Sequence, residues 1–308
     1  MSNEKPLKNL DLFIERFWNE NTFVIMDTET NGLDPEIHEP CEVAMLKIEG
    51  GVVGEPSSWY VKPKLPIPPH VQAVHHISND DVKSAPSMKE LEPVFQDYCR
   101  GAIVIAHNAP FDKSMMPCLQ GEEFQWLDNL RLARHMWPLG TPNKEGHPLN
   151  AHKNKILQHW MGLEVNTRGQ SAHRAQADIL VTAEIFKIGM NTYLERLYKK
   201  QRNLVEPSYE KMAADLEKPC KVELMPFGPH KDSPIEEVPT QHLRSLVFRH
   251  NKGESNLGVD LYAALSKEYN KRVARIKKPE EVKVETERKE LRKQVNENNK
   301  TITPNVVK

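Results

Sequence analysis

Two carboxylates stand two positions apart at the end of an apolar stretch near the N-terminus. Phe23–Met26 is apolar, Asp27 and Glu29 follow, and Asn31–Gly32 is a turn signal. This pattern predicts a buried strand, in which residues i and i+2 point to the same face. Two like charges side by side at a buried strand end repel each other, and a divalent cation would relieve that repulsion. The stretch favours a carboxylate metal site, with a pair of solvated acids as the alternative.

Three further titratable residues lie where later elements are expected to begin. Asp112 follows the apolar run 102–106, and Asp178 lies early in a helical stretch that starts near His173. Taken singly, Asp112 would be an ordinary acid in the first turn of a helix, where its negative charge interacts favourably with the helix dipole. Asp178 alone would be an ordinary polar residue of a helix face. The whole set is more specific than any of its members.

Together these residues resemble the DEDDh branch of the DnaQ-like 3′→5′ exonucleases. Asp27–Leu33 (DTETNGL) is similar to the family's first motif, His107–Asp112 (HNAPFD) to its second and His173–Asp178 (HRAQAD) to its third. The order and separation of the motifs also agree, and the resemblance covers roughly residues 21–199. It implies phosphodiester hydrolysis from a 3′ end, with Mg²⁺ or Mn²⁺ as cofactor.

The resemblance implies a role for each acid. Two Mg²⁺ or Mn²⁺ ions would bind to carboxylate oxygens, which such hard cations prefer as ligands. Asp27 would bridge both ions, Glu29 and Asp178 would complete the first site, and Asp112 would hold the second ion. His173 would be the general base, because a neutral imidazole accepts a proton near neutral pH.

Other motif positions imply contacts with the substrate. Thr28 and Thr30 would hold the terminal nucleotide, Leu33 would wedge beneath the last base, and Phe111 would pack near the sugar or base. Apolar wedging and stacking tolerate any base, which suits an enzyme that must remove every nucleotide.

Histidines complete the expected substrate contacts. His75 lies in a segment (VHHI) that resembles the family's His-Gly-Ile signature, with His76 in place of the glycine. Five residues before His75, His70 stands where many relatives have a Glu or Gln that touches substrate. His107 and Asn108 either contact the nucleic-acid backbone or order their loop, and we weigh the two equally.

The order of the expected elements predicts an α/β fold. A helix over about residues 7–21 leads into the first strand, and strands over 42–48 and 59–61 follow with short connections that indicate antiparallel hairpins. Helices then alternate with strands over 102–106 and 126–129. We expect a ribonuclease H-like mixed sheet, with three antiparallel strands and then parallel strands, flanked by helices and followed by a small C-terminal appendage.

The chain of 308 residues exceeds the usual size of one domain. We expect, in order, an N-terminal helix (1–21), an exonuclease domain (22–200), a linker (201–222), a small module (223–270) and a charged tail, helical or disordered (271–308). The small module resembles the segment after the nuclease domain in exodeoxyribonuclease X and its relatives. Two interpretations stay open for this module. Its basic residues Lys231, Arg244 and Arg249 help to steer a DNA strand toward the metals, or the module only packs against the exonuclease domain.

Charge and composition narrow the class further. Residues 271–308 contain 12 Lys/Arg and 6 Asp/Glu, whereas the whole chain has a net charge of −1, so the body is acidic and the tail basic. The 4 cysteines lack a CxxC pair, which fits reduced thiols. Neither a signal peptide nor a membrane span is expected. We therefore expect a soluble, cytoplasmic protein without a membrane partner.

The sequence predicts a metal-dependent 3′→5′ exonuclease that releases nucleoside 5′-monophosphates from single-stranded or 3′-end DNA. An RNA 3′-end exoribonuclease is the first alternative, because the same motifs serve both substrates. The sequence identifies no residue that would require or exclude the 2′-OH of RNA. A non-catalytic nucleic-acid-binding module is the second, and the intact set of five catalytic residues argues against it.

Overall fold

The computed structural model describes residues 4–166, 174–200 and 207–275. The chain divides into two compact units, Met1–Lys221 and Val222–Lys308, and each is described by itself. Across the described ranges, no helix is both long enough and apolar enough to cross a membrane.

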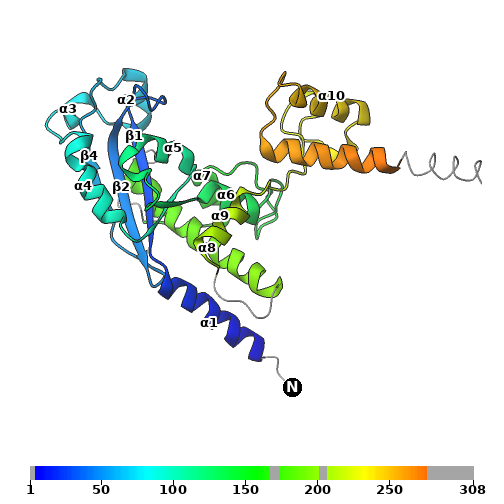
Figure 1. Ribbon diagram of the computed structural model, residues 1–308, viewed down its shortest axis with the longest axis horizontal. Coiled ribbons are helices and arrows are strands. Elements are labelled where there is room, and N and C mark those ends of the chain that lie inside the picture. Colours follow the sequence, from blue (N-terminus) through cyan, green and yellow to red (C-terminus); the bar gives the residue numbers. More distant parts are fainter. Residues whose placement is uncertain (1–3, 167–173, 201–206, 276–308) are drawn as a thin grey trace, which may run out of the picture. The chain divides into compact units, whose positions relative to one another are not determined.

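A mixed sheet lies at the centre of the first unit (Figure 1). Its strands are β1 (Phe23–Thr30), β2 (Pro40–Glu49), β3 (Val52–Val53), β4 (Ser57–Tyr60), β5 (Ile103–Ala106) and β6 (Gln125–Asp128). The order is β3-β2-β1-β5-β6, with β4 also paired to β2. β1 and β2 are antiparallel, as are the pairs of β2 with β3 and β4, whereas β5 is parallel to β1 and β6. This mixed sheet confirms the predicted fold class.

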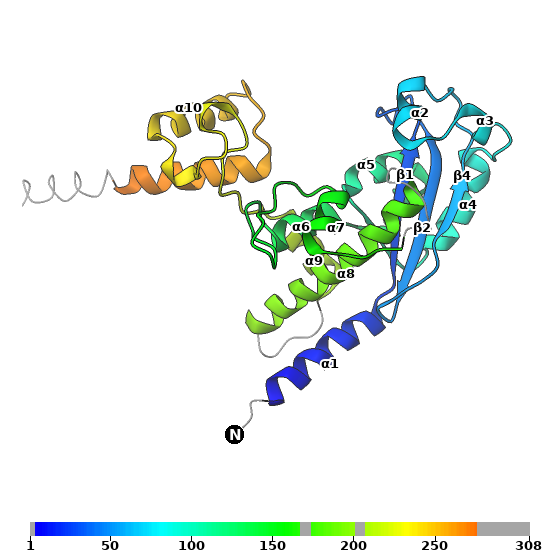
Figure 2. The same ribbon diagram turned by 180° about the vertical axis from the view of Figure 1, so that it is seen from behind.

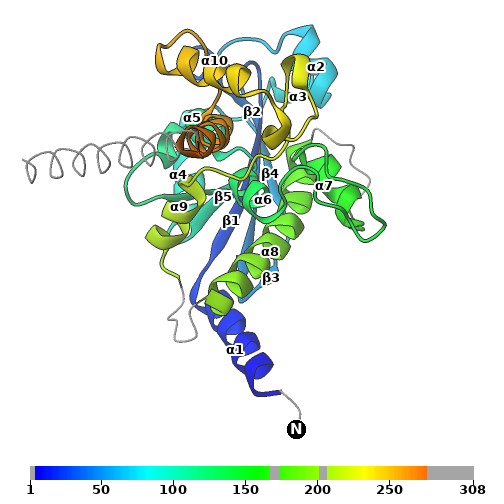
Figure 3. The same cartoon turned by 90° about the vertical axis from the view of Figure 1, so that its right-hand side faces the viewer.

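Helices flank the sheet on both faces (Figures 1 and 2). The helices of this unit are α1 (Glu4–Glu20), α2 (Pro69–His75), α3 (Asn79–Val82), α4 (Met88–Cys99), α5 (Ala109–Met115), α6 (Asn129–Met136), α7 (Asn154–Met161), α8 (Ala175–Lys200) and α9 (Tyr209–Glu217), with a 3₁₀ turn η1 (Pro117–Leu119). α4 begins at a capping box, in which Glu90 Oε2 accepts from the N–H of Ser87 at 2.8 Å, and it continues through Pro93. α6 and α7 both pack against α8 (Figure 3).

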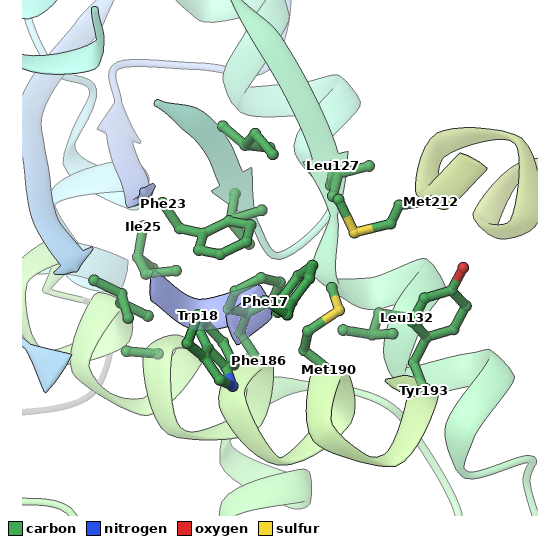
Figure 4. Packing of buried hydrophobic residues seen from close by; sticks show 14 of the residues in the cluster. Phe17, Trp18, Phe23, Ile25, Leu127, Leu132, Phe186, Met190, Tyr193 and Met212 are labelled. Atoms are coloured by element: carbon green, nitrogen blue, oxygen red, sulfur yellow. The ribbon is translucent and has the colours of Figure 1, made fainter. Parts of the chain in front are cut away.

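The larger core lies between the sheet and helices α1 and α8 (Figure 4). The rings of Phe23 in β1 and Phe186 in α8 meet edge-on with centroids 5.0 Å apart, and Trp18 of α1 packs edge-on against both. Edge-to-face pairs of this kind stabilise beyond their buried area. The N-terminal helix is therefore part of the core of the first unit, and it ties α8 to the strand that carries Asp27.

The segment expected as a linker, residues 201–222, contains a helix that packs on the first unit. Met212 and Leu216 of α9 are buried in the same core as α8. Nε of Arg131 on α6 donates to the Leu216 carbonyl at 3.0 Å and so caps the end of α9. Residues 209–217 thus form a helix within the expected linker, and its apolar pair at i, i+4 faces the core of the first unit.

The second unit has a small core of its own. It contains the 3₁₀ turns η2 (Gly228–His230) and η3 (Ile235–Glu237), the helix α10 (Thr240–Asn251) and a helix over residues 259–275. Apolar side chains from all of these elements except η2 fill the core: Met225, Ile235, Val238, Leu243, Val247, Leu261 and Leu265. Arg272 donates to the Val238 carbonyl at 2.7 Å and pairs with Glu268 at 2.8 Å. The described helix thus reaches into the segment expected as a charged tail, whose remainder lies outside the described residues.

Candidate functional site

Three acids meet where β1 approaches its end. Asp27 and Glu29 alternate with Thr28, so they point to the face of the sheet that α8 covers. Asp178, in the first turn of α8, approaches from that side. One carboxylate oxygen of each lies within 4.8 Å of the other two. The structure thus brings together three of the residues predicted for catalysis in a group that could hold a metal ion.

Asp112 reaches the same strand from α5 but is not a member of that group. Its Oδ1 accepts hydrogen bonds from the backbone N–H of Thr28 at 3.0 Å and from the Thr28 hydroxyl at 2.9 Å. Asp112 is buried, and its charge is one cause of the raised pKa of Asp27. His173 lies outside the described residues, so its role stays a prediction.

Burial and mutual repulsion raise the pKa values of these acids. Burial, followed by the charge of Asp112, raises the pKa of Asp27 well above its usual range. Burial and the charge of Asp178 raise the pKa of Glu29 to about 8. Burial raises the pKa of Asp112 to about 7, although the hydrogen bonds from Thr28 oppose this shift. Burial and mutual repulsion thus favour the protonated forms of these side chains when no cation is bound.

We expect the metal-free protein to lose stability as the pH rises from about 5 to about 8. Glu29 and Asp112 have ordinary pKa values of 4.5 and 3.8 but folded values of about 8 and about 7. The folded state therefore binds more protons than the unfolded state in this window, and its free energy of unfolding falls with pH. A cation would replace those protons, so Mn²⁺ should raise the melting temperature more at about pH 8 than at about pH 5.5.

Thermal unfolding followed by fluorescence, in EDTA and in MnCl₂ across this pH range, measures both effects. A melting temperature that falls with pH in EDTA and rises with Mn²⁺ supports the cation site. A profile that Mn²⁺ does not change at any pH contradicts it.

An apolar pocket of about 620 Å³ opens beside the acids. Glu29 belongs to both the pocket and the acid group. Five predicted substrate contacts line the pocket: Thr28, Thr30, Leu33, His75 and Phe111. Leu33 is 81% exposed, so its side chain is accessible to a ligand in the pocket. α2 lies beyond the end of β1 (Figure 2), and its residues His70, Val71, Val74 and His75 supply one wall of the pocket.

The residues of the pocket wall that sequence reasoning missed include His38, Val71 and Val74. Val71, Val74 and His75 follow the i, i+3, i+4 period of α2, a pattern that the sequence contains and that would have found them. His38 packs directly on Gly32, where an added Cβ would lie 2.3 Å from its Cδ2. That contact closes an irregular loop, and no spacing rule predicts it.

The two adjacent histidines at the C-terminal end of α2 have different environments. His75 is buried, its Nδ1 accepts from the N–H of Ile77 at 3.1 Å, and burial lowers its pKa. His76 ends the helix in the left-handed conformation, with a φ of 61°. Glycine adopts this conformation without strain, which explains the glycine of the His-Gly-Ile signature. For His76 this left-handed conformation costs about 1–2 kcal/mol of conformational free energy.

His107 and Asn108 are not among the residues that line this pocket. The ring of His107 contacts the His152 carbonyl through Nε2 at 2.6 Å and the Asn129 amide through Nδ1 at 3.3 Å. Asn108 has a φ of 85°, and its N–H donates to Oδ1 of Asp128 at 3.1 Å. These contacts fit a loop-ordering role, and a substrate contact for either residue stays a prediction.

The fold and the acid group together define the class of the protein. A mixed sheet with carboxylates at the end of its first strand is the architecture of the ribonuclease H-like exonucleases. The RNase_T family model, described as exonuclease, matches residues 24–186, more than half of the chain. The chain therefore belongs to this exonuclease family.

Individual relatives match over different shares of their length. Exodeoxyribonuclease 10 of Escherichia coli is 33% identical over 169 residues, which cover 54% of this chain and 68% of that protein. A DNA polymerase III subunit epsilon-like protein of Rhodobacter capsulatus is 35% identical over 173 residues, or 54% of this chain but only 23% of the relative. Among solved structures, exonuclease X in complex with 5′ overhanging duplex DNA is 27% identical, with a TM-score of 0.47, and the match covers 63% of this chain and 99% of that one.

Proposed function

We propose that this protein is a metal-dependent 3′→5′ exonuclease that hydrolyses DNA and releases nucleoside 5′-monophosphates. The observation that carries the proposal is the group of Asp27, Glu29 and Asp178 beside an apolar pocket, with Asp112 bound to the adjoining Thr28. Membership of the exonuclease family supports hydrolysis. The names of the relatives, exodeoxyribonuclease 10 and DNA polymerase III subunit epsilon-like protein, support DNA as the substrate.

The donor set fits Mg²⁺ or Mn²⁺, because these hard cations prefer carboxylate oxygens. Asp27, Glu29 and Asp178 would hold one ion, and Asp27 and Asp112 would hold a second. Bound ions would polarise the scissile phosphate and lower the pKa of the attacking water. The raised pKa values of the acids support this fit, because a cation would take the place of the protons that they retain.

The side chains of the pocket would bind and orient the 3′-terminal nucleotide. Leu33 would lie beneath its base, and Phe111 would pack against its sugar or base. The Thr28 hydroxyl donates to Asp112, and the Thr30 hydroxyl donates to the Gly32 carbonyl at 2.6 Å. We therefore assign the two hydroxyls to ordering the strand end, and the nucleotide contact at Thr30 to its backbone. His173 would accept the proton of the attacking water.

Side-by-side degradation of 5′-labelled single-stranded DNA, duplex DNA with a 3′ overhang, and RNA tests this proposal. We expect a ladder of shortened DNA that keeps its 5′ label, release of nucleoside 5′-monophosphates, and loss of both in EDTA. If the protein cleaves RNA and neither DNA substrate, the proposal of a DNA substrate is wrong and RNA is the substrate. Cleavage in EDTA would refute the metal mechanism, and binding without cleavage would indicate a nucleic-acid-binding module.

We infer that α10 of the second unit adds affinity for the DNA strand. Arg244, Phe248, Arg249 and Lys252 are exposed along this helix, and Lys252 Nζ lies 4.6 Å from the Phe248 ring centroid. The sequence from 238 to 253 contains no Asp or Glu. An exposed aromatic ring among cations fits single-stranded nucleic acid, which offers bases for stacking and phosphates for ion pairs.

Replacing Arg244 and Arg249 together by Ala should weaken binding of single-stranded DNA without lowering kcat. Loss of two phosphate contacts should reduce the slope of log K against log salt by about 1.4. Fluorescence anisotropy at several KCl concentrations measures this slope. Lys267→Ala is the control, because Lys267 is an exposed cation on the other helix of the unit. Equal slopes for the double variant and the wild type would contradict a DNA-binding role of α10 and would favour a packing role for this unit.

A further inference from the structure

A further carboxylate lies beside the acid group and is not needed as a metal ligand. Glu42 of β2 stands directly opposite Glu29 of β1 in the strand register, so the two side chains share one face of the sheet. The Glu42 side chain is only 2% exposed. Like charges opposite each other destabilise a sheet, and a buried unpaired carboxylate costs more still. Glu42 therefore needs partners that offset its burial.

The partners of Glu42 come from segments that are far apart in the sequence. Nε and Nη2 of Arg174 donate to its two oxygens, Oε2 and Oε1, at 3.3 Å each. The N–H of Ala175 donates to Oε2 at 3.3 Å, and the Ser58 hydroxyl donates to Oε1 at 2.8 Å. Nη2 of Arg174 also donates to the Tyr60 hydroxyl at 2.8 Å. Both carboxylate oxygens are satisfied, and the guanidinium contacts β2 and β4 together.

This network fixes the first turn of α8, which carries Asp178. The Arg174 carbonyl accepts from the N–H of Asp178 at 3.1 Å, so the two residues lie one turn apart on the same side of the helix. Ala175 is fully buried in that turn, and its small side chain allows the helix to approach the sheet closely. Because Glu42 holds this turn against β2, it also determines how Asp178 faces Glu29.

Arg174 also offsets charge at the edge of the acid group. Glu29 already faces the negative charges of Asp178 and Glu42, and the guanidinium opposes them. Without Arg174, the buried charge of Glu42 would add to a group of carboxylates that repel one another. The pair therefore affects both the orientation of one carboxylate and the field at another.

We propose that Glu42 and Arg174 form a positioning pair that orients Asp178 for metal binding. The inference rests on the proposed exonuclease function and deepens it. Neither residue contacts metal or substrate in this role. What separates the pair from an ordinary buried ion pair is that the helix turn it anchors carries a carboxylate of the acid group. Groups that orient metal ligands typically change metal affinity or activity by about 10- to 100-fold when they are lost.

Glu42→Gln and Arg174→Gln, singly and together in the full chain, test this proposal. Each single substitution leaves a buried partner without its opposite charge. We expect the dissociation constant for Mn²⁺ alone, measured by calorimetry, to rise about 10- to 100-fold, kcat to fall by a similar factor, and KM for a DNA oligonucleotide to change less than about twofold. The double variant removes both charges, so it should regain melting temperature but not Mn²⁺ affinity.

Arg196→Ala is the matched control on the same helix. Arg196 donates to the carbonyls of His135 and Met136 at 3.0 and 2.9 Å, away from the acids. It should lower the melting temperature and leave Mn²⁺ affinity unchanged. If Glu42→Gln does not fold, Arg174→Lys is the milder variant, because it keeps the charge but loses the two-point contact.

Two outcomes separate this inference from the function on which it rests. Wild-type Mn²⁺ affinity and kcat in folded Glu42→Gln, or in Arg174→Lys, would overturn the positioning role while the exonuclease proposal stands. A wild-type protein that binds Mn²⁺ but cuts no nucleic acid would refute the exonuclease proposal. In that case a raised Mn²⁺ dissociation constant in Glu42→Gln would still support the positioning of Asp178.

Discussion

Replacing Asp27 by Asn should abolish DNA cleavage and, at about pH 8, raise the melting temperature of the metal-free protein. Asp27 is buried, and the charges of Asp112, Glu29 and Asp178 all raise its pKa. Asn keeps the shape of the side chain but removes the charge on which cation binding depends. We expect the rate to fall by at least about 10³-fold, the upper range for loss of one electrostatic group. The same substitution removes repulsion, so the folded state gains stability when no cation is present.

Cleavage of a 5′-labelled oligonucleotide and thermal unfolding with and without MnCl₂ measure these opposite effects. Asp27→Ala should show the same loss of cleavage and leave the fold intact. Asp97→Asn is the matched control, because Asp97 is an exposed acid on α4 that pairs only loosely with Arg100, at 3.7 Å. Full activity in Asp27→Asn, or a Mn²⁺-induced rise in melting temperature equal to that of the wild type, would contradict the metal site.

The sequence was sufficient to place the acids because each motif belongs to one element. Alternation along β1 puts Asp27 and Glu29 on one face, and the helical period places Asp178 in the first turn of α8. The apolar run that forms β5 delivers the chain to Asp112. The alternation of strands and helices then determines the sheet, because parallel strands need a crossover between them.

Contacts between segments that are far apart in the sequence could not be predicted from the motifs. Glu42 and Arg174 are 132 positions apart, and nothing in the spacing of either motif links them. The two hydrogen bonds that tie Asp112 to Thr28 likewise depend on how α5 meets β1. Such pairings are set by packing, which a pattern within one element cannot reveal. The residues that hold the acids in place were therefore harder to predict than the acids themselves.

Replacing His173 by Ala should lower kcat by about 10²- to 10⁴-fold, the usual contribution of a general base. The affinity for Mn²⁺ and KM for DNA should stay near wild type, since the acids and the apolar pocket supply those interactions. Cleavage rates at saturating Mn²⁺, Mn²⁺ calorimetry and oligonucleotide binding measure the three quantities. His147→Ala is the matched control, because the His147 side chain is 74% exposed and its ion pair is with the exposed Glu145.

The pH dependence distinguishes a base from a ligand. Protons and the cation compete for Glu29 and Asp112, whose pKa values are raised. The part of the pH–rate profile that reflects metal binding should therefore move to lower pH as the Mn²⁺ concentration is raised. A limb that belongs to a general base with an ordinary imidazole pKa near 6.5 should not move with Mn²⁺, and it should vanish in His173→Ala. Loss of Mn²⁺ binding in that variant would instead make His173 a ligand, and the proton of the attacking water would then need a different acceptor.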